Sequence, residues 1–201
     1  SCDVVSTGMI LSAEQAALVS DFCEQSAKKG ALVFVDPIMG DEGKLYNGVG
    51  EETIAHMRKM VAVADCIVPN YTEAAYLADM PYHEDMTEEE ARALTIRLHE
   101  MGAKSVVVTS AKVDGENCVV GYDGTEGEFF RIPFDLIPVR FVGTGDIFAA
   151  VMLGRLVDGV PLQESTHRAM AAVRTMIDRI RDKEDKYLGI PIETCLEVLD
   201  E

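Results

Sequence analysis

Basic residues are scarce in this 201-residue sequence, which has 18 Lys and Arg against 35 Asp and Glu and a formal net charge of -17. A surface this acidic repels polyanions such as nucleic acid, and it repels anionic membranes for the same reason. We therefore exclude nucleic acid and membrane as partners.

Long hydrophobic runs and cysteine motifs are also lacking. No apolar stretch approaches the length of a membrane span, and no signal peptide is visible. The five cysteines are odd in number, scattered and without a C-x-x-C pattern, which predicts reduced, mostly buried thiols in a cytoplasmic protein. With 48% hydrophobic residues and no repeat or linker, residues 1–201 are predicted to form one domain with a substantial core.

Short apolar segments alternate with segments of helical periodicity along the chain. The predicted strands cover residues 2–6, 31–35, 66–68 and 105–108, and a hairpin joins 117–122 to 128–132 around Asp123-Gly124. The predicted helices cover residues 12–29, 51–63, 72–79, 87–101, 145–158, 162–182 and 191–200. Such alternation predicts an α/β fold, a three-layer αβα sandwich with a mostly parallel central sheet.

Polar residues follow three of the predicted strands: Asp36, then Asn70 with Glu73, then Thr109 with Ser110. Ligands of such sheets bind beyond the carboxyl ends of the strands, so this shared placement predicts one composite site. Each motif alone also has a plainer interpretation. Asp36 suits a turn, Asn70 and Glu73 suit a capping box, and the hydroxyls of Thr109 and Ser110 suit a turn cap.

The sequence Gly143-Thr144-Gly145-Asp146 opens a long apolar run. A glycine turn that leads into a helix presents unpaired backbone N–H groups and partial positive charge, which makes it an anion site. That environment suits a phosphoryl group in transfer. Taken alone, Asp146 is better explained as a helix-capping residue.

Together these motifs resemble the ribokinase-like kinases of small metabolites and, among them, the pyridoxal kinase group. The stretches that carry the resemblance lie in the family's order and span most of the chain: residues 6–8, 36–46, 68–73, 107–110 and 141–150. The glycine turn is shared across the superfamily. The stretch from Asp36 to Tyr46, with its second aspartate, Asp41, is more specific to vitamin B6 kinases.

The resemblance implies a catalytic role for the glycine turn. Asp146 is similar to the base that binds the substrate's primary hydroxyl and takes its proton. The backbone N–H groups of Gly143, Thr144 and Gly145 are similar to the anion hole for the transferring phosphoryl group. Such a site fits phosphoryl transfer, which depends mostly on positioning and charge neutralisation.

The resemblance also implies a nucleotide site. Asp36 and Glu73 would handle the Mg²⁺ of Mg-ATP, with Asn70 in support, because hard oxygen ligands suit this ion. Gly40, Asp41 and Tyr46 would belong to a loop that closes over the phosphates. The remaining implied ATP-binding residues are Val68, Thr109, Ser110, Arg131, Phe134 and Val139.

The implied activity is ATP-dependent phosphorylation of the hydroxymethyl group of pyridoxal, pyridoxine or pyridoxamine. Mg²⁺ would offset the charge of ATP on so acidic a chain, and a monovalent cation such as K⁺ is a further candidate cofactor. The family resemblance also implies a homodimer.

Two alternatives stay open. A hydroxymethylpyrimidine kinase of thiamine synthesis shares the fold, although that group usually carries Cys where Asp146 stands and lacks the Gly40-Asp41…Tyr46 pattern. The alternative from another class is a non-catalytic nucleotide-binding domain.

The sequence begins where the family's Thr-Gly stretch lies, at Thr7-Gly8. The family's leading strand-helix unit, which contacts the pyridine ring, has no counterpart here. Because a buried-type strand at residues 2–6 would otherwise be an exposed edge, we expect the native protein to carry a further N-terminal segment with at least one βαβ unit.

Overall fold

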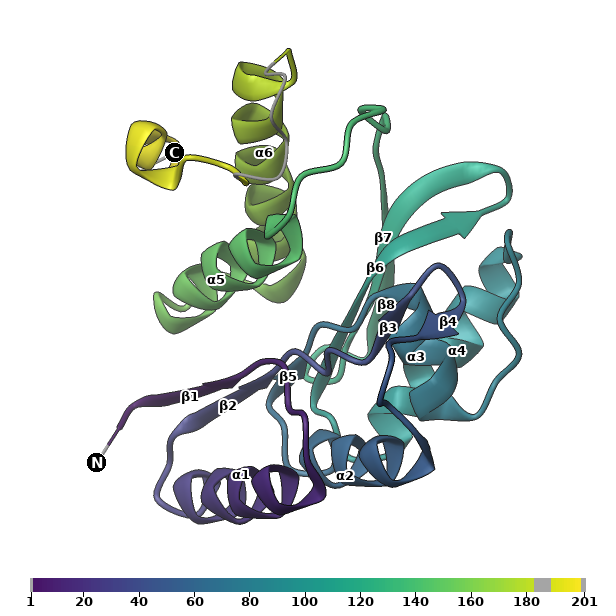
Figure 1. The fold of residues 1–201 in the computed structure, drawn as a ribbon, viewed down its shortest axis with the longest axis vertical. Coiled ribbons are helices and arrows are strands. Elements are labelled where there is room, and N and C mark those ends of the chain that lie inside the picture. Colours follow the sequence, from purple (N-terminus) through teal and green to yellow (C-terminus); the bar gives the residue numbers. More distant parts are fainter. Residues whose placement is uncertain (1, 183–188, 200–201) are drawn as a thin grey trace. The chain divides into compact units, whose positions relative to one another are not determined.

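The computed structural model describes residues 2–182 and 189–199, and the chain forms two compact units, Ser1–Phe134 and Asp135–Glu201 (Figure 1). The first unit contains a mixed sheet with four helices. The second unit is helical.

The sheet has six strands in the order β1-β2-β5-β6-β7-β8. The first four are parallel, and β7 and β8 continue the sheet as antiparallel neighbours of β6. The strands are β1 (Val4–Thr7), β2 (Leu32–Val35), β5 (Cys66–Ile67), β6 (Ser105–Val113), β7 (Glu116–Asp123) and β8 (Glu128–Pro133). A mostly parallel sheet flanked by helices confirms the predicted α/β fold class.

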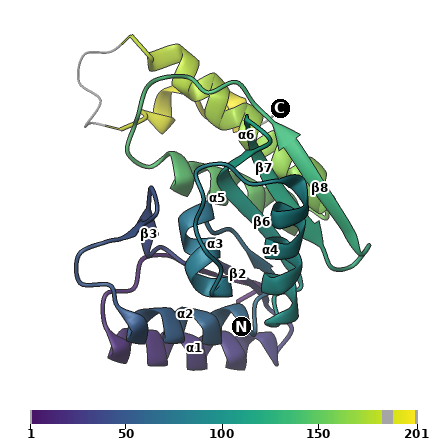
Figure 2. The same cartoon turned by 90° about the vertical axis from the view of Figure 1, so that its right-hand side faces the viewer.

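Four helices connect the parallel strands: α1 (Ala13–Ala27), α2 (Glu51–Val61), α3 (Tyr71–Ala78) and α4 (Glu88–Glu100). Three of them begin at or within one residue of the predicted starts, and their N-caps Ser12, Asn70 and Thr87 each accept a hydrogen bond from a backbone N–H in the first turn. The parallel strands follow one another in a single direction across the sheet, so right-handed crossovers place these helices on the same face. Figure 2 shows α1 beside α2 and α3 beside α4.

The core of the first unit lies between that face and the helices. Val33 and Val35 of β2, with Ile67 of β5, are fully buried and belong to a single apolar cluster with residues of all four helices. The intervening residue Phe34 is fully buried as well, and so is Val107 in β6. Strands β2 and β6 are therefore buried on both faces.

Two features of the first unit differ from the sequence prediction. Residues predicted as a loop form a small antiparallel hairpin, β3 (Gly40–Asp41) with β4 (Lys44–Leu45). The strand predicted to end at residue 108 runs on as β6, with a register shift between Val108 and Ala111. It turns into β7 through Asp114-Gly115, whose positive φ values of 50° and 83° suit a tight hairpin turn. The Asp-Gly pair was the signal for this second hairpin.

The second unit consists of α5 (Thr144–Val157), α6 (Leu162–Ile180) and two short 3-10 turns, Ile192–Thr194 and Leu196–Leu199. It has a core of its own that includes Phe141, Ile147 and Met176. The predicted helix over 191–200 is wrong across the described residues 191–199. The Thr194 hydroxyl donates to Pro191 O at 2.8 Å, and such a local side-chain bond competes with a regular helix. Residue 200 lies outside the described residues.

Two composition-based predictions can be compared with this fold. The five cysteines are free thiols, four of them buried and Cys2 exposed, as expected. Among the helices of the described residues, none has the length and apolar character needed to cross a bilayer.

Packing between β7 and β8 predicts that Gly121→Ala destabilises the protein. A Cβ at this position would lie 2.2 Å from the ring of Phe130, its partner on β8, so the ring would have to move. We expect a loss of about 1–3 kcal/mol in the free energy of unfolding, measured by chemical denaturation. The control is Gly154→Ala, at an exposed position near the C-terminal end of α5, where a Cβ meets no atom within 4 Å. It should gain about 0.5–1 kcal/mol instead, and equal effects of the two changes would contradict the prediction.

Candidate active site

The carboxyl ends of the parallel strands bring the predicted residues of the first unit to one edge of the sheet. Asp36 directly follows β2, and its N–H donates to Thr7 O of β1 at 3.4 Å. Asn70 follows β5 and forms an isolated parallel bridge with Thr109 of β6. The Thr7 hydroxyl at this edge is buried and has no hydrogen-bond partner within the described parts of the chain. An orphaned buried hydroxyl is rare in a native fold and is consistent with a ligand at this edge.

Glu73 is the most buried charged group at this edge, with 3% of its surface exposed. Its carboxylate accepts three backbone hydrogen bonds, from Met39 N–H at 2.9 Å, Gly40 N–H at 3.5 Å and Asn70 N–H at 2.8 Å. The Asn70 side chain accepts in turn from Glu73 N–H at 3.0 Å, which completes a capping box at the start of α3. The plainer interpretation of these two residues is therefore true, and Glu73 also contacts a second segment of chain.

Burial, with a smaller contribution from the negative charge of Asp36, raises the pKa of Glu73 to about 7. The N–H groups of Met39, Asn70 and Gly40 oppose this shift because they stabilise the ionised form. Glu90 holds the equivalent capping position in α4, but there the hydrogen bonds from Thr87 lower the pKa at an exposed site. The same motif thus gives opposite shifts because only Glu73 is buried.

The β3–β4 hairpin lies on the first turn of α3. Asn70 Nδ2 donates to Gly40 O at 2.8 Å, and the Thr72 hydroxyl accepts from Gly43 N–H at 2.8 Å. Gly40 has no room for a side chain, because a Cβ would lie 2.3 Å from Lys44 O across the hairpin. The predicted loop residues Asp41 and Tyr46 lie in and beside this hairpin, half-buried and exposed respectively.

Arg131 is engaged in a cluster of acidic groups. Its guanidinium donates to Val113 O and to Glu116, each at 2.7 Å, and it pairs with Asp114 at 3.4 Å and with Glu88 at 3.8 Å. These contacts hold the β6–β7 hairpin. The predicted role of Arg131 in ATP binding would require this guanidinium to act while it carries them.

The other predicted nucleotide-binding residues range from buried to exposed. Val68 is buried, Phe134 is half-buried and donates its N–H to Asn117 O, and Ser110 is exposed with a φ of 55° at the irregularity in β6. Val139 belongs to the second unit and packs against the core of that unit.

The glycine turn of the second unit has the predicted geometry. Gly143 is the N-cap of α5, with a φ of 87°, and has no side chain with which to cap the helix. The N–H of Ile147 bonds to Gly143 O at 3.0 Å, so the earlier N–H groups of the first turn lack acceptors within the helix. No atom lies within 4 Å of where a Cβ on Gly145 would be, so packing does not demand glycine there, and the open backbone can approach an anion.

Asp146 is the third residue of α5 and is exposed. With Gly143 as the N-cap, Asp146 holds the third position of the helix, the position that Glu73 holds in α3 and Glu90 in α4, so the capping interpretation stays open beside the catalytic one. An exposed carboxylate beside a turn of backbone donors can accept a proton next to a bound anion.

The described residues contain no group of three or more His, Cys, Asp or Glu side chains that could hold a metal ion. A carboxylate has about four acceptor positions, and Glu73 uses three of them on backbone N–H groups. One position is left, and the nearby charge of Asp36 is unfavourable to Glu73. This donor set fits Mg²⁺ held through water, since this ion usually keeps several waters and takes only one or two carboxylates.

Sequence reasoning missed Thr72 and Tyr82, which contact the tip of the β3–β4 hairpin. The hydrogen bond from Gly43 to Thr72 joins residues 29 positions apart, and no local pattern signals it.

In comparisons with known proteins, the chain is similar to kinases of small metabolites. A family model described as phosphomethylpyrimidine kinase matches residues 1–188. The pyridoxal kinase of Arabidopsis thaliana is 32% identical over 171 residues, covering 81% of this chain and 53% of that protein. The pyridoxal kinase of Sus scrofa is 35% identical over 170 residues, covering 75% and 51%. The chain thus spans about half the length of the curated relatives it matches.

Solved structures that resemble this chain carry the same two names. A Bacteroides thetaiotaomicron structure that carries the name phosphomethylpyrimidine kinase has a TM-score of 0.94 and 32% identity, covering 99% of this chain and 69% of its own. Another crystal form of that protein is named as containing pyridoxal. The pyridoxal kinase of Lactobacillus plantarum has a TM-score of 0.84 and 28% identity, covering 98% and 71%. These neighbours confirm the ribokinase-like fold.

The raised pKa of Glu73 predicts a specific pH dependence of stability. A carboxyl whose pKa rises on folding contributes stability below its unfolded value, near 4.5, and this contribution is lost as pH rises through about 7. In buffer with EDTA, the free energy of unfolding of the wild type should therefore fall between pH 4.5 and 7 relative to Glu73→Gln, by on the order of 1–3 kcal/mol. Denaturant titrations at several pH values measure the difference. Parallel pH profiles for the two proteins would contradict the prediction.

Proposed function

Since the chain belongs to the phosphomethylpyrimidine kinase family, we propose that the protein is an ATP-dependent kinase that phosphorylates the hydroxymethyl group of pyridoxal, pyridoxine or pyridoxamine. The observation that carries this proposal is the first turn of α5, where Asp146 is exposed beside backbone N–H groups that have no acceptor within the helix. In this proposal Asp146 takes the proton of the substrate hydroxyl as that oxygen attacks the γ-phosphorus of ATP, and ADP leaves. The N–H groups of Gly143, Thr144 and Gly145 stabilise the charge on the transferring phosphoryl group.

The strand ends of the first unit supply the nucleotide side of the proposed reaction. Asp36 and Glu73 hold Mg²⁺ in part through water, and Asn70 keeps the Glu73 carboxylate in place through the capping box. Thr109, paired with Asn70, contacts the phosphates. Bound Mg²⁺ would neutralise phosphate charge, which matters for a chain with a net charge of -17.

The B6 vitamers are favoured as substrates because the curated relatives are named pyridoxal kinases and because the stretch from Asp36 to Tyr46 is present. A hydroxymethylpyrimidine kinase is the second candidate, since the matching family model is described as phosphomethylpyrimidine kinase. A coupled ADP-release assay on the full chain, with the three vitamers and hydroxymethylpyrimidine run side by side, separates the two. Turnover of the pyrimidine alone would replace the B6 proposal. ATP binding without turnover of any of them would favour the non-catalytic alternative.

Asp146→Asn tests the proposed base. We expect turnover to fall by about two to four orders of magnitude, the usual contribution of a general base, while the affinity for ATP changes little. Asp158→Asn, at the other end of the same helix, is the matched control and should keep wild-type turnover. Near-normal turnover in Asp146→Asn would remove this residue from the mechanism.

Glu73→Gln tests the proposed metal role. The Mg²⁺ concentration for half-maximal rate should rise, because the neutral amide attracts the metal-bound water less strongly than the carboxylate. Glu90→Gln changes the equivalent capping residue of α4 and should leave the Mg²⁺ curve unmoved. If Glu73→Gln shifts only the melting temperature, Glu73 serves the fold alone.

Three further parts of the proposal concern the oligomeric state of the protein, its location in the cell and its need for a monovalent cation. We propose a homodimer, which sedimentation velocity would test, and a cytoplasmic location. A requirement for a monovalent cation such as K⁺ would appear as a rate difference between potassium and tetramethylammonium salts.

A further inference from the structure

The β3–β4 hairpin cannot fix its own position. Each of its strands has only two residues, and an isolated hairpin of this size is unstable in water. Two hydrogen bonds join its base to α3. The Glu73 carboxylate accepts from Met39 N–H, and the Asn70 side chain donates to Gly40 O. Any movement of the hairpin therefore also disturbs these two side chains.

Thr72 holds the tip of the hairpin from the first turn of α3. Its hydroxyl accepts the N–H of Gly43 at 2.8 Å, and the residue is 3% exposed. The capping box of this helix is made by Asn70 and Glu73, so the helix does not need the Thr72 hydroxyl as a cap. This hydroxyl bonds to the hairpin instead.

Tyr82 supports the same tip from the loop between α3 and α4. A Cβ on Gly43 would lie 2.9 Å from the Tyr82 ring, and the φ of 77° at Gly43 also favours glycine. The Tyr82 ring stacks on Tyr71 at 4.8 Å between centroids, and the Tyr71 hydroxyl accepts from His83 N–H at 3.0 Å. The ring is thus held in place under the glycine.

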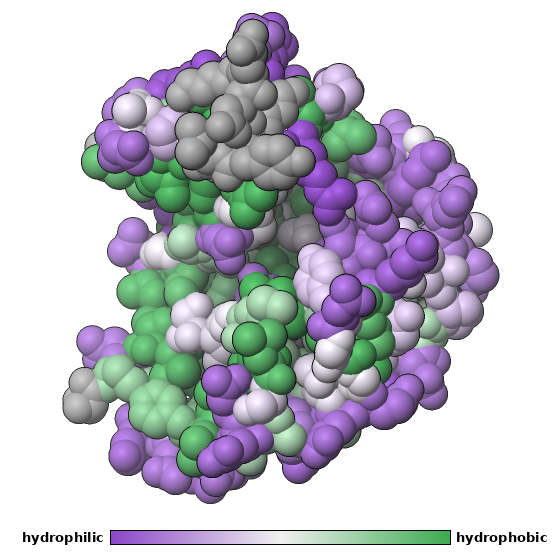
Figure 3. Space-filling view, viewed as in Figure 1, coloured by the Kyte–Doolittle hydropathy of each residue, from purple (hydrophilic) through white to green (hydrophobic). Residues whose placement is uncertain are grey.

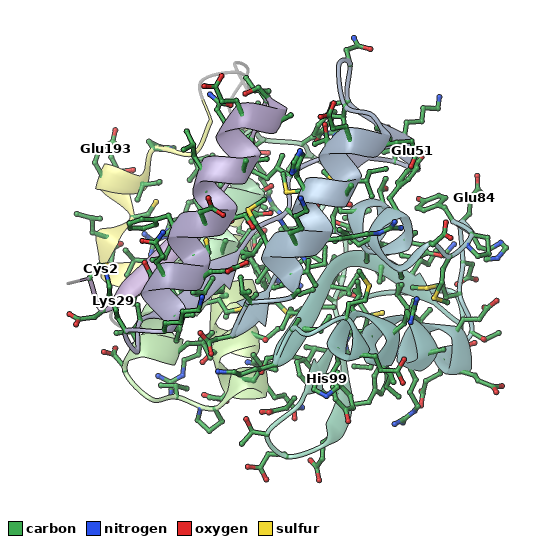
Figure 4. All side chains as sticks on the ribbon, turned by 90° about the horizontal axis from the view of Figure 1, so that it is seen from below. Cys2, Lys29, Glu51, Glu84, His99 and Glu193 are labelled. Atoms are coloured by element: carbon green, nitrogen blue, oxygen red, sulfur yellow. The ribbon has the colours of Figure 1, made fainter. Side chains whose placement is uncertain are left out.

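Acidic residues surround the tip of the hairpin. Burial raises the pKa of Tyr82, and the nearby negative charges of Asp41, Glu84 and Glu42 raise it further. Figure 4 shows Glu84 at the periphery of the first unit. Hydrophilic residues also dominate the surface on the side of α3 and α4 in Figure 3. The contacts that Thr72 and Tyr82 make with Gly43 involve no charged group.

We propose that Thr72 and Tyr82 are positioning residues that fix the β3–β4 hairpin and, through it, orient Glu73 and Asn70 for the Mg-nucleotide. This inference rests on the proposed function only for the identity of the ligand. The contacts of Thr72 and Tyr82 with Gly43 hold without it.

Two substitutions in the full chain, each with a conservative partner, test the inference. Thr72→Val removes the acceptor and keeps the shape, whereas Thr72→Ser keeps the hydroxyl. Tyr82→Leu removes the ring, whereas Tyr82→Phe keeps it. We expect Thr72→Val and Tyr82→Leu to speed hydrogen exchange of the 40–45 amides and to raise the Kd for Mg²⁺–AMP-PNP about fivefold, the effect of losing roughly one net hydrogen bond. In the kinase assay, KM for ATP should rise by a similar factor, with kcat changed less.

Thr95→Val is the matched control, because it removes a buried threonine hydroxyl that donates to Arg92 O within α4, away from the hairpin. It should leave both the exchange of residues 40–45 and the Kd unchanged, as should Thr72→Ser and Tyr82→Phe. Unchanged exchange in Thr72→Val and Tyr82→Leu would overturn the inference, and so would faster exchange with an unchanged Kd. Calorimetric binding of Mg²⁺–AMP-PNP needs no turnover, so an inactive wild type would overturn the proposed phosphotransfer and leave this test decisive.

Discussion

The burial of the Glu73 carboxylate is the constraint on which the proposed nucleotide site of the first unit depends. A buried charge must be compensated, and here three backbone N–H groups from two segments compensate it. One of these segments is the start of α3 and the other leads into the β3–β4 hairpin. A single side chain therefore joins a strand end, a helix start and a hairpin that are separate in the sequence. The raised pKa of Glu73 indicates that the compensation is incomplete, which is the state in which a nearby cation is most favourable.

The second unit handles negative charge by different means. The first turn of α5 has no side-chain cap, and Gly143 and Gly145 leave its backbone accessible. Partial positive charge at a helix start attracts an anion without adding a single basic residue. In the proposed function, a chain with 35 acidic and 18 basic residues would bind a polyphosphate locally in this way, while its overall field opposes one. Arg131, which the family resemblance places near the nucleotide, also pairs with acidic groups of the β6–β7 hairpin.

Much of the fold could be predicted from the sequence because its signals are local. Continuous apolar runs ending in polar residues gave the parallel strands and their shared edge, and cap residues such as Ser12 and Thr87 marked helix starts. The β3–β4 hairpin could not be predicted, since its two-residue strands are stabilised by contacts with α3 and not by their own periodicity. The 3-10 turns after Pro191 were also mistaken for a helix, because the competing bond of Thr194 does not change the apolar pattern.

The capping box at Asn70 and Glu73 shows why a structural and a functional interpretation of one motif need not exclude each other. A helix cap fixes the rotamer and the ionised oxygens of its carboxylate, and a metal or phosphate site needs the same fixed geometry. Glu90 makes an equivalent cap in α4 but stays exposed, so its charge is screened by water. Burial under the hairpin is what distinguishes Glu73. The sequence pattern of the two caps is alike, and the difference arises only from the tertiary contact that brings residues 39 and 40 onto the carboxylate.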